Sequence, residues 1–240
     1  MFARRFPLIA LSAAALFASA CSEKTSPPAA PTAAPAAAAS DAQAQKSVEM
    51  YRQLLQSKSY ELAGPIGQEI VTKYPNTPAA KEVQETLADT VAKATAITAR
   101  RRLERLWIYQ SGKESGGDQS TASIYSSQPA SAERVRLVLR RHSAWGQSAY
   151  LFGSGKGFEC GRNCALSVRF DDTPPQRMKA YLPETGEPAI FVSDDRGFLN
   201  RMSKSQKVSI DAVVKNKGAQ TLVFEVGGFD PEKFAALKKK

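Results

Sequence analysis

The segment VSIDAVV, residues 208–214, decides the fold class because its apolar residues alternate with polar ones. Successive side chains on a strand point to opposite faces, so this pattern predicts a strand with one buried and one solvated face. The same period of two recurs at 134–140, 166–170 and 221–226. Short strands separated by turn residues are typical of an antiparallel sandwich or barrel. We expect a β-sandwich domain over residues 105–230.

Two short helices are expected beside these strands. One interrupts the sandwich at 196–204, where the alternation stops. The other follows Asp230-Pro231, because aspartate accepts hydrogen bonds from the first amides of a helix and proline fits its first turn. We therefore predict a short C-terminal helix and a basic tail over 231–240.

The region 43–104 has helical periodicity instead. Leu62, Ile66, Ile70 and Tyr74 recur every four residues, as on one face of a helix. Thr77 and Pro78 predict the N-cap and first residue of a further helix, which is expected to end or bend near the triple arginine 100–102. The chain is therefore predicted to be α+β, with an N-terminal helical hairpin, or neck, before the sandwich.

The segment Tyr60 to Val83 resembles the second helix and exit of one tetratricopeptide unit. The likeness rests on KYPNTPAAKEV, residues 73–83, and on the spacing of Ala63 and Pro75. It would imply a peptide-binding groove. A single unit cannot bury its own face, so a plain helical hairpin is the alternative.

Residues 1–20 are typical of an export signal. Arg4 and Arg5 precede the apolar run 8–17, which is too short to span a bilayer. Ala18-Ser-Ala-Cys21 resembles a bacterial lipobox, which implies acylation of Cys21, whereas ordinary signal peptidase cleavage before this cysteine is the alternative. Residues 21–42, rich in Ala and Pro, are typical of a tether. By resemblance to lipoproteins, Ser22 implies an outer-membrane destination on the periplasmic face.

The chain has three cysteines, so lipidation of Cys21 leaves Cys160 and Cys164 to pair. The turn-forming residues Gly-Arg-Asn between them can close a hairpin, and an oxidising periplasm favours a structural disulfide. A redox pair or half of a metal site are the alternatives. No cofactor and no metal site are predicted.

The formal net charge of +10 suggests affinity for an acidic partner or anionic envelope material. An exported protein without a nucleic-acid-binding motif is not expected to bind nucleic acid. The candidate binding residues are Arg100, Arg101, Arg102, Arg136 and Arg140. Trp107, Trp145, Tyr109, Tyr125, Tyr150 and Tyr181 could line a binding face, but at period two such residues more often form the core.

Catalytic residues are not predicted. His142 is the single histidine and follows Arg140-Arg141, where a solvated surface position is usual. The pairs Asp171-Asp172 and Asp194-Asp195 could serve glycoside hydrolysis or Ca²⁺ binding if they converged, but each lies at a strand end, where a turn is the simpler interpretation. We expect a protein that is not an enzyme.

Several motifs between Trp107 and Phe229 resemble those of periplasmic accessory proteins of secretion machines, the TagO-like group associated with type VI secretion. These motifs are Leu-Trp-Ile-Tyr at 106–109, Phe-Glu-Cys at 158–160, Cys164 leading into 168–172, and the closing 224–229. The resemblance implies a non-enzymatic module that contacts envelope proteins. We expect an outer-membrane lipoprotein with such a binding role; an immunity or inhibitor lipoprotein against a toxin, or a peptidoglycan-binding or peptidoglycan-acting protein, are the alternatives.

Overall fold

The computed structural model describes residues 34–130, 134–153 and 155–234. The helices are α1 (Ala34–Gln56), α2 (Tyr60–Lys73), α3 (Pro78–Glu104) and α4 (Asp195–Met202), and a 3₁₀ turn, η1, spans Val226–Gly228. The strands are β1 (Trp107–Glu114), β2 (Gly117–Tyr125), β3 (Arg136–His142), β4 (Gly146–Phe152), β5 (Phe158–Glu159), β6 (Ala165–Phe170), β7 (Gln176–Tyr181), β8 (Ala189–Val192), β9 (Val208–Val214) and β10 (Gly218–Phe224). Cys21, the signal segment and the basic tail beyond 234 lie outside the described residues.

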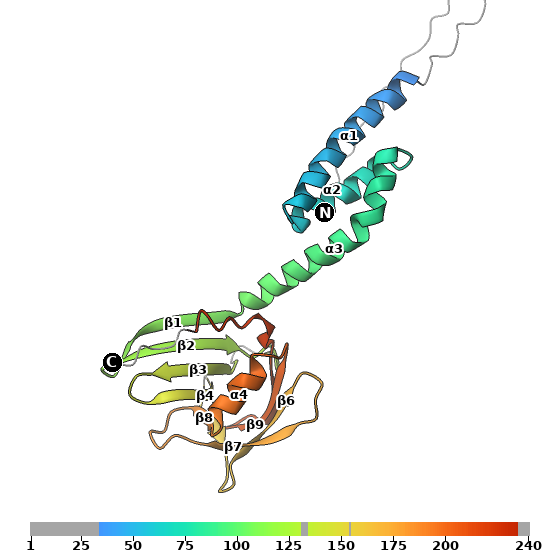
Figure 1. Ribbon diagram of the computed structural model, residues 1–240. Coiled ribbons are helices and arrows are strands. Elements are labelled where there is room, and N and C mark those ends of the chain that lie inside the picture. Colours follow the sequence, from blue (N-terminus) through green and yellow to red (C-terminus); the bar gives the residue numbers. More distant parts are fainter. Residues whose placement is uncertain (1–33, 131–133, 154, 235–240) are drawn as a thin grey trace, which may run out of the picture.

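The predicted α+β class, with a mainly antiparallel sheet, is confirmed. The strands follow one hydrogen-bonded path, β1-β2-β3-β4-β8-β7-β6-β9-β10, and β5 adds to β9. The narrower prediction of a β-sandwich is not confirmed, because this single path curls around the core (Figure 1).

Strand β7 is where the sheet turns. Residues 176–179 pair with β6, whereas residues 180–181 pair with β8. The curl brings the far end of the path back toward its beginning, since the chain just after β2 hydrogen-bonds with β10. The Ser127 amide donates to the Val223 carbonyl at 2.7 Å, and the Val223 amide donates to the Gln128 carbonyl at 3.1 Å.

The core lies inside this curl. It collects the inward residues of the strands, among them Leu137, Leu139, Leu151, Val168, Ile210, Leu222 and Phe224. Helix α4 contributes Phe198 and Met202, both fully buried, so it packs against the inner face of the sheet. The alternation that predicted the strands therefore reports correctly which side chains are inside.

Helices α1, α2 and α3 form an arm beside the β-rich head, which we define as Trp107–Phe234 (Figure 1). The arm contains three helices, so a hairpin alone is not confirmed. Thr77 caps α3 as predicted, because its Oγ1 accepts from the Ala80 amide at 3.2 Å and Pro78 occupies the first turn. The arm has its own small core, in which Tyr51, Ile70 and Val83 are buried.

One expected boundary was wrong. Helix α1 begins at Ala34, within the predicted tether, because alanine is the strongest helix former. Helix α3 includes the triple arginine, since arginine and leucine also favour helix, and it ends at Glu104, where the helical region was expected to end.

The junction between arm and head is close-packed. Only residues 105 and 106 separate α3 from β1. The η1 turn packs against the end of α3 so tightly that a Cβ on Gly228 would lie 2.2 Å from the carbonyl carbon of Leu103. The indole of Trp107 donates to the Val226 carbonyl at 3.3 Å. These contacts fix the head on the helix.

The predicted C-terminal helix is absent from its described part, residues 231–234. These residues form a turn instead, in which the Glu232 amide donates to the Asp230 carboxylate at 2.9 Å. Asp230 thus satisfies an amide as a cap would, but no helix follows up to Phe234. Among the described helices, none is both long and apolar enough to cross a membrane.

Candidate arginine–aromatic binding face

Strand β3 places two arginines on the outer face of the sheet. Leu137 and Leu139 are buried in the core, so Arg136 and Arg140 project from the opposite, outer face of the sheet. In the neighbouring strands, Phe152 is the register partner of Arg136, and Tyr150 pairs with Phe191 of β8. The arginine–aromatic face consists of Arg136, Arg140, Tyr150, Phe152, Tyr181 and Phe191.

Three rings of this face form a continuous stack across β4, β8 and β7. The Tyr150 and Phe191 ring centroids lie 4.6 Å apart, and those of Phe191 and Tyr181 lie 5.3 Å apart, with interplanar angles of 26° and 18°. Phe191 is only 7% exposed because it lies between the two tyrosines. The stack therefore covers the middle ring, whereas Tyr181 at its end is 49% exposed.

Each arginine of the face lies over aromatic rings. The Arg140 guanidinium is 5.1 Å from the Trp145 centroid and 5.5 Å from that of Tyr150. The Arg136 guanidinium is 5.3 Å from the Phe152 centroid and 5.8 Å from that of Tyr125. Contacts within about 6 Å are favourable because the ring faces carry negative electrostatic potential. The rings hold both guanidinium groups in place.

The two arginines of this face have no direct carboxylate partner within the described chain, although Glu187 and Glu114 lie near enough to act on the pKa of Tyr150. Within the described chain, neither Arg136 nor Arg140 forms an ion pair. The Arg140 Nε donates to the neutral Ser148 hydroxyl at 3.2 Å. Burial raises the pKa of Tyr150, and both arginines act against that rise. A guanidinium fixed on a ring and lacking a carboxylate is available to an anionic ligand.

The other predicted binding arginines lie on α3 and have a different environment. Arg100 pairs with Glu104 at 2.9 Å and Arg101 with Glu61 at 2.5 Å. Arg102 contacts Glu225 of the head through both terminal nitrogens, at 2.7 and 3.1 Å. The structure therefore does not bring the two groups of arginines together, and those on α3 already have carboxylate partners.

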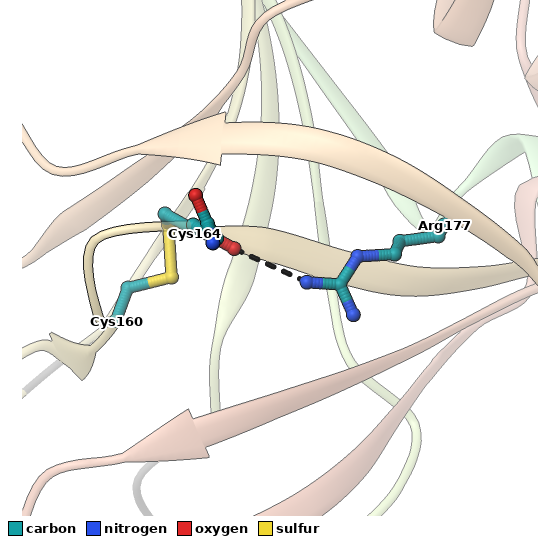
Figure 2. The surroundings of a disulfide bond; sticks show 4 residues. Cys160, Cys164 and Arg177 are labelled. Atoms are coloured by element: carbon teal, nitrogen blue, oxygen red, sulfur yellow. Dashed lines mark hydrogen bonds between the residues drawn. A yellow bond between two sulfur atoms is a disulfide. The ribbon is translucent and has the colours of Figure 1, made fainter.

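The predicted disulfide joins Cys160 and Cys164 (Figure 2). It closes the loop between β5 and β6, and the Arg177 guanidinium donates to the Asn163 carbonyl of that loop at 3.2 Å. The disulfide closes the loop on itself, and the hydrogen bond from Arg177 holds it to β7. This arrangement is consistent with a structural role for the pair.

The two acidic pairs support backbone geometry. The Asp171 carboxylate accepts from the amides of Gln206 and Lys207, both at 2.8 Å, while its own φ is 51°. Asp194 caps α4 by accepting from the Gly197 amide at 2.9 Å. Asp171 therefore acts in a turn, as the simpler interpretation predicted, whereas Asp194 acts as a helix cap and not in a turn.

The prediction of a solvated His142 was wrong. The ring is 3% exposed and stacks on Trp145 with centroids 3.8 Å apart. Its Nδ1 accepts from the amides of Ala144 and Trp145, so Nε2 carries the proton and donates to the Glu114 carbonyl at 2.9 Å. The imidazole fixes the turn between β3 and β4, and with it the Trp145 ring beside Arg140.

The aromatic half of the face was predicted only in part: Tyr150 and Tyr181 were named as residues that could line a binding face, with the core as the favoured interpretation, and Phe152 and Phe191 were not named. Trp107 and Tyr109 do pack against the core as expected, but Tyr125 and Tyr181 are 38% and 49% exposed. Strand β4 gave a usable signal: both of its faces carry large apolar residues, Leu151 inside and Tyr150 outside. A strand that is apolar on both faces needs cover on its outer face as well.

No three His, Cys, Asp or Glu side chains gather in a way that could hold a metal ion in the part of the chain that the structure describes. Comparison with known proteins finds no matching family model, no similar characterised protein and no similar solved structure. The arginine–aromatic face is therefore the feature of the described chain that bears most directly on function.

Proposed function

We propose that this protein is a lipid-anchored periplasmic binding module of the outer membrane, which docks an acidic surface of an envelope protein through the arginine–aromatic face. The observation that carries the proposal is the pair Arg136 and Arg140, fixed on rings and without an ion pair in the described chain. Complementary charge steers association and suppresses wrong partners. Arginine and aromatic residues are also enriched at the centres of protein interfaces.

The environment of the rings favours a protein partner over a glycan. A sugar would stack on an open ring face, but the Tyr150, Phe191 and Tyr181 rings stack mainly on one another. Trp145 is covered on one side by His142. The accessible surface combines the guanidinium groups with the exposed parts of Tyr181 and Trp145, and this mixture of charge and apolar area suits the carboxylates and apolar side chains of a protein surface.

A binding role also agrees with the use of the acidic side chains. Glycoside hydrolysis, the reaction that the acidic pairs could serve, needs two converging carboxylates. Asp171 and Asp194 instead accept backbone hydrogen bonds at separate places in the fold, the one beside Lys207 and the other at the start of α4. A non-enzymatic accessory role is therefore the better supported hypothesis.

Site-specific photo-crosslinking in the source bacterium tests this function. A photoreactive phenylalanine replaces Tyr181, at the exposed edge of the face, in the tagged full-length protein. We expect a crosslink to one envelope protein that disappears in Arg136→Glu/Arg140→Glu. The control is Arg169→Glu, which reverses an equivalent exposed arginine on β6 and should leave the crosslink intact.

A crosslink that survives reversal of both face arginines would contradict the proposal. Recovery of glycan alone would favour the peptidoglycan alternative, and recovery of a toxin would favour an immunity role. A photoreactive residue at Leu62, 62% exposed on the arm, shows whether any capture is particular to the face.

The anchor is tested separately. In Cys21→Ser the acceptor of the acyl chains is lost, so we expect the protein to move from the membrane fraction to the soluble periplasmic fraction. Retention in the membrane fraction would contradict the lipid anchor, without affecting the argument on the face.

A further inference from the structure

A hollow of about 280 Å³ opens beside the arginine–aromatic face, over strands β1 to β4. Tyr150 and Phe152 form one wall, and Arg136 belongs to both the face and the hollow. Gly112 of β1 lies on the opposite side, where a Cβ would meet no atom within 4 Å. The missing side chain at this position helps to leave the space open.

The polar lining of the hollow is cationic or neutral. Its two charged residues are Arg136 and Lys113, and no aspartate or glutamate lines it. In the described chain neither cation forms an ion pair. Its other polar groups include the amides of Gln110 and Gln119 and the hydroxyls of Thr121 and Ser123. All four neutral side chains can donate hydrogen bonds to an anion.

We propose that this hollow receives a carboxylate side chain from an extended acidic peptide segment. The carboxylate would pair with the Arg136 guanidinium, and the neutral donors of β1 and β2 would satisfy the flanking peptide groups. Lys113 lies opposite Asp118 in the register of β1 and β2, so Arg136 is the cation of the hollow that is available to an anion. Its planar guanidinium can bind a carboxylate through two parallel hydrogen bonds. This inference rests on the proposed function and narrows it to the kind of segment that the face recognises.

The shape and lining favour a peptide over a membrane surface. Lipid headgroups are usually met by clusters of several lysines and arginines, whereas one lysine and one arginine line this hollow. Amide and hydroxyl groups in a row along two strands match the donors and acceptors that recur along an extended peptide. The volume suits a single side chain with its adjoining backbone better than a folded surface.

The test measures binding of a fluorescent hexaglutamate peptide to the full-length protein in detergent, by fluorescence anisotropy at low salt. We expect binding, no binding of hexaglutamine, and weakening by about tenfold or more in Arg136→Gln, because a charge-assisted bidentate contact is lost. Gly112→Phe should weaken binding comparably, since the ring fills the hollow without removing a charge. Gly112→Ala is the matched control and should bind within about twofold of the wild type.

The outcomes separate this inference from the proposed function. Weaker binding in Gly112→Phe, with the circular dichroism spectrum unchanged, supports the hollow as the site. If Arg136→Gln and Arg140→Gln both weaken binding but Gly112→Phe does not, the face binds the peptide outside the hollow and the inference fails while the proposed function stands. If hexaglutamate does not bind, and anionic phospholipid vesicles bind in a way that Gly112→Phe abolishes, a lipid headgroup is the ligand and the inference is overturned.

Discussion

The arm and the head use arginine in opposite ways. On α3, Arg100, Arg101 and Arg102 each lie beside a carboxylate of the same chain. On β3, Arg136 and Arg140 lie on aromatic rings instead. A triple arginine is the more conspicuous motif in a sequence, yet its charges are already used to hold the arm together and to the head. Whether a cluster of basic residues is available to a partner therefore depends on its environment, and not on the number of basic residues that are adjacent in the sequence.

The two regions also differ in the size of their cores. The head buries several phenylalanines, including Phe158, Phe198 and Phe224, whereas half of the fully packed core residues of the arm are alanines. Because buried area drives folding, the head should supply most of the stability. Both tryptophans, Trp107 and Trp145, belong to the head, so their fluorescence reports on that region alone.

The largest effect is expected from Phe198→Ala. This ring is fully buried and lies 5.7 Å from the Phe170 ring, so its removal should lower the free energy of unfolding of the head by about 4 kcal/mol. Urea titration followed by tryptophan fluorescence measures it. Ile70→Ala, at a fully buried position of the arm, is the control and should shift mainly the helical circular dichroism. Equal shifts in both signals would show that arm and head unfold as one unit.

A smaller effect tests the two groups of arginines directly. We expect Arg136→Gln/Arg140→Gln to weaken hexaglutamate binding by about tenfold or more, and Arg101→Gln/Arg102→Gln to change it by no more than about twofold. The comparison removes two positive charges in each case, so long-range attraction is lowered similarly. Fluorescence anisotropy measures both variants at one salt concentration. Equal loss in the two variants would mean that net charge alone governs binding.

The smallest effect concerns the ion pair between arm and head. The hydrogen bonds from Arg102 lower the pKa of Glu225, so the pair stabilises the fold above the ordinary glutamate range. That contribution is lost as the pH falls through the lowered pKa of the folded state. We expect Glu225→Gln to lower Tm by no more than about 2 °C at neutral pH, since the pair is largely exposed, and the difference from the wild type to vanish in acid.

Glu82→Gln is the matched control for that measurement. Arg52 lowers the pKa of Glu82 in the same way, but this pair joins α1 to α3 within the arm. In both variants, the difference in Tm from the wild type should become smaller as the pH falls. A difference that widens as the pH falls would contradict the assignment of either pair.

Local pattern predicted the elements of the head well. The quoted alternation at 208–214 coincides with β9, and the run 166–170 lies within β6. The curl of the sheet was not predictable in this way, because alternation reports which side chains are buried and not which strands pair. The neighbours β4 and β8, for example, are separated in sequence by β5, β6 and β7.

The candidate site was predictable only in part. Arg136 and Arg140 follow from charge on an alternating strand, but their aromatic neighbours come from three other strands whose pairing the sequence does not state. The pairing of Arg102 depends on Glu225, which is 123 residues away. No local pattern carries such information, because the contact exists only once the head has folded against α3.

Because α3 passes almost directly into β1, the helix determines the direction in which the head faces. A helix of 27 residues extends about 40 Å and turns about 100° per residue. The packing of η1 against its end prevents the head from rotating freely about the helix axis. The length of α3 therefore sets both the distance of the β3 arginines from the start of the helix and their orientation about the helix axis. One residue inserted into the exposed middle of α3 would change the reach only slightly, but it would rotate the whole head by more than a quarter of a circle about the helix axis.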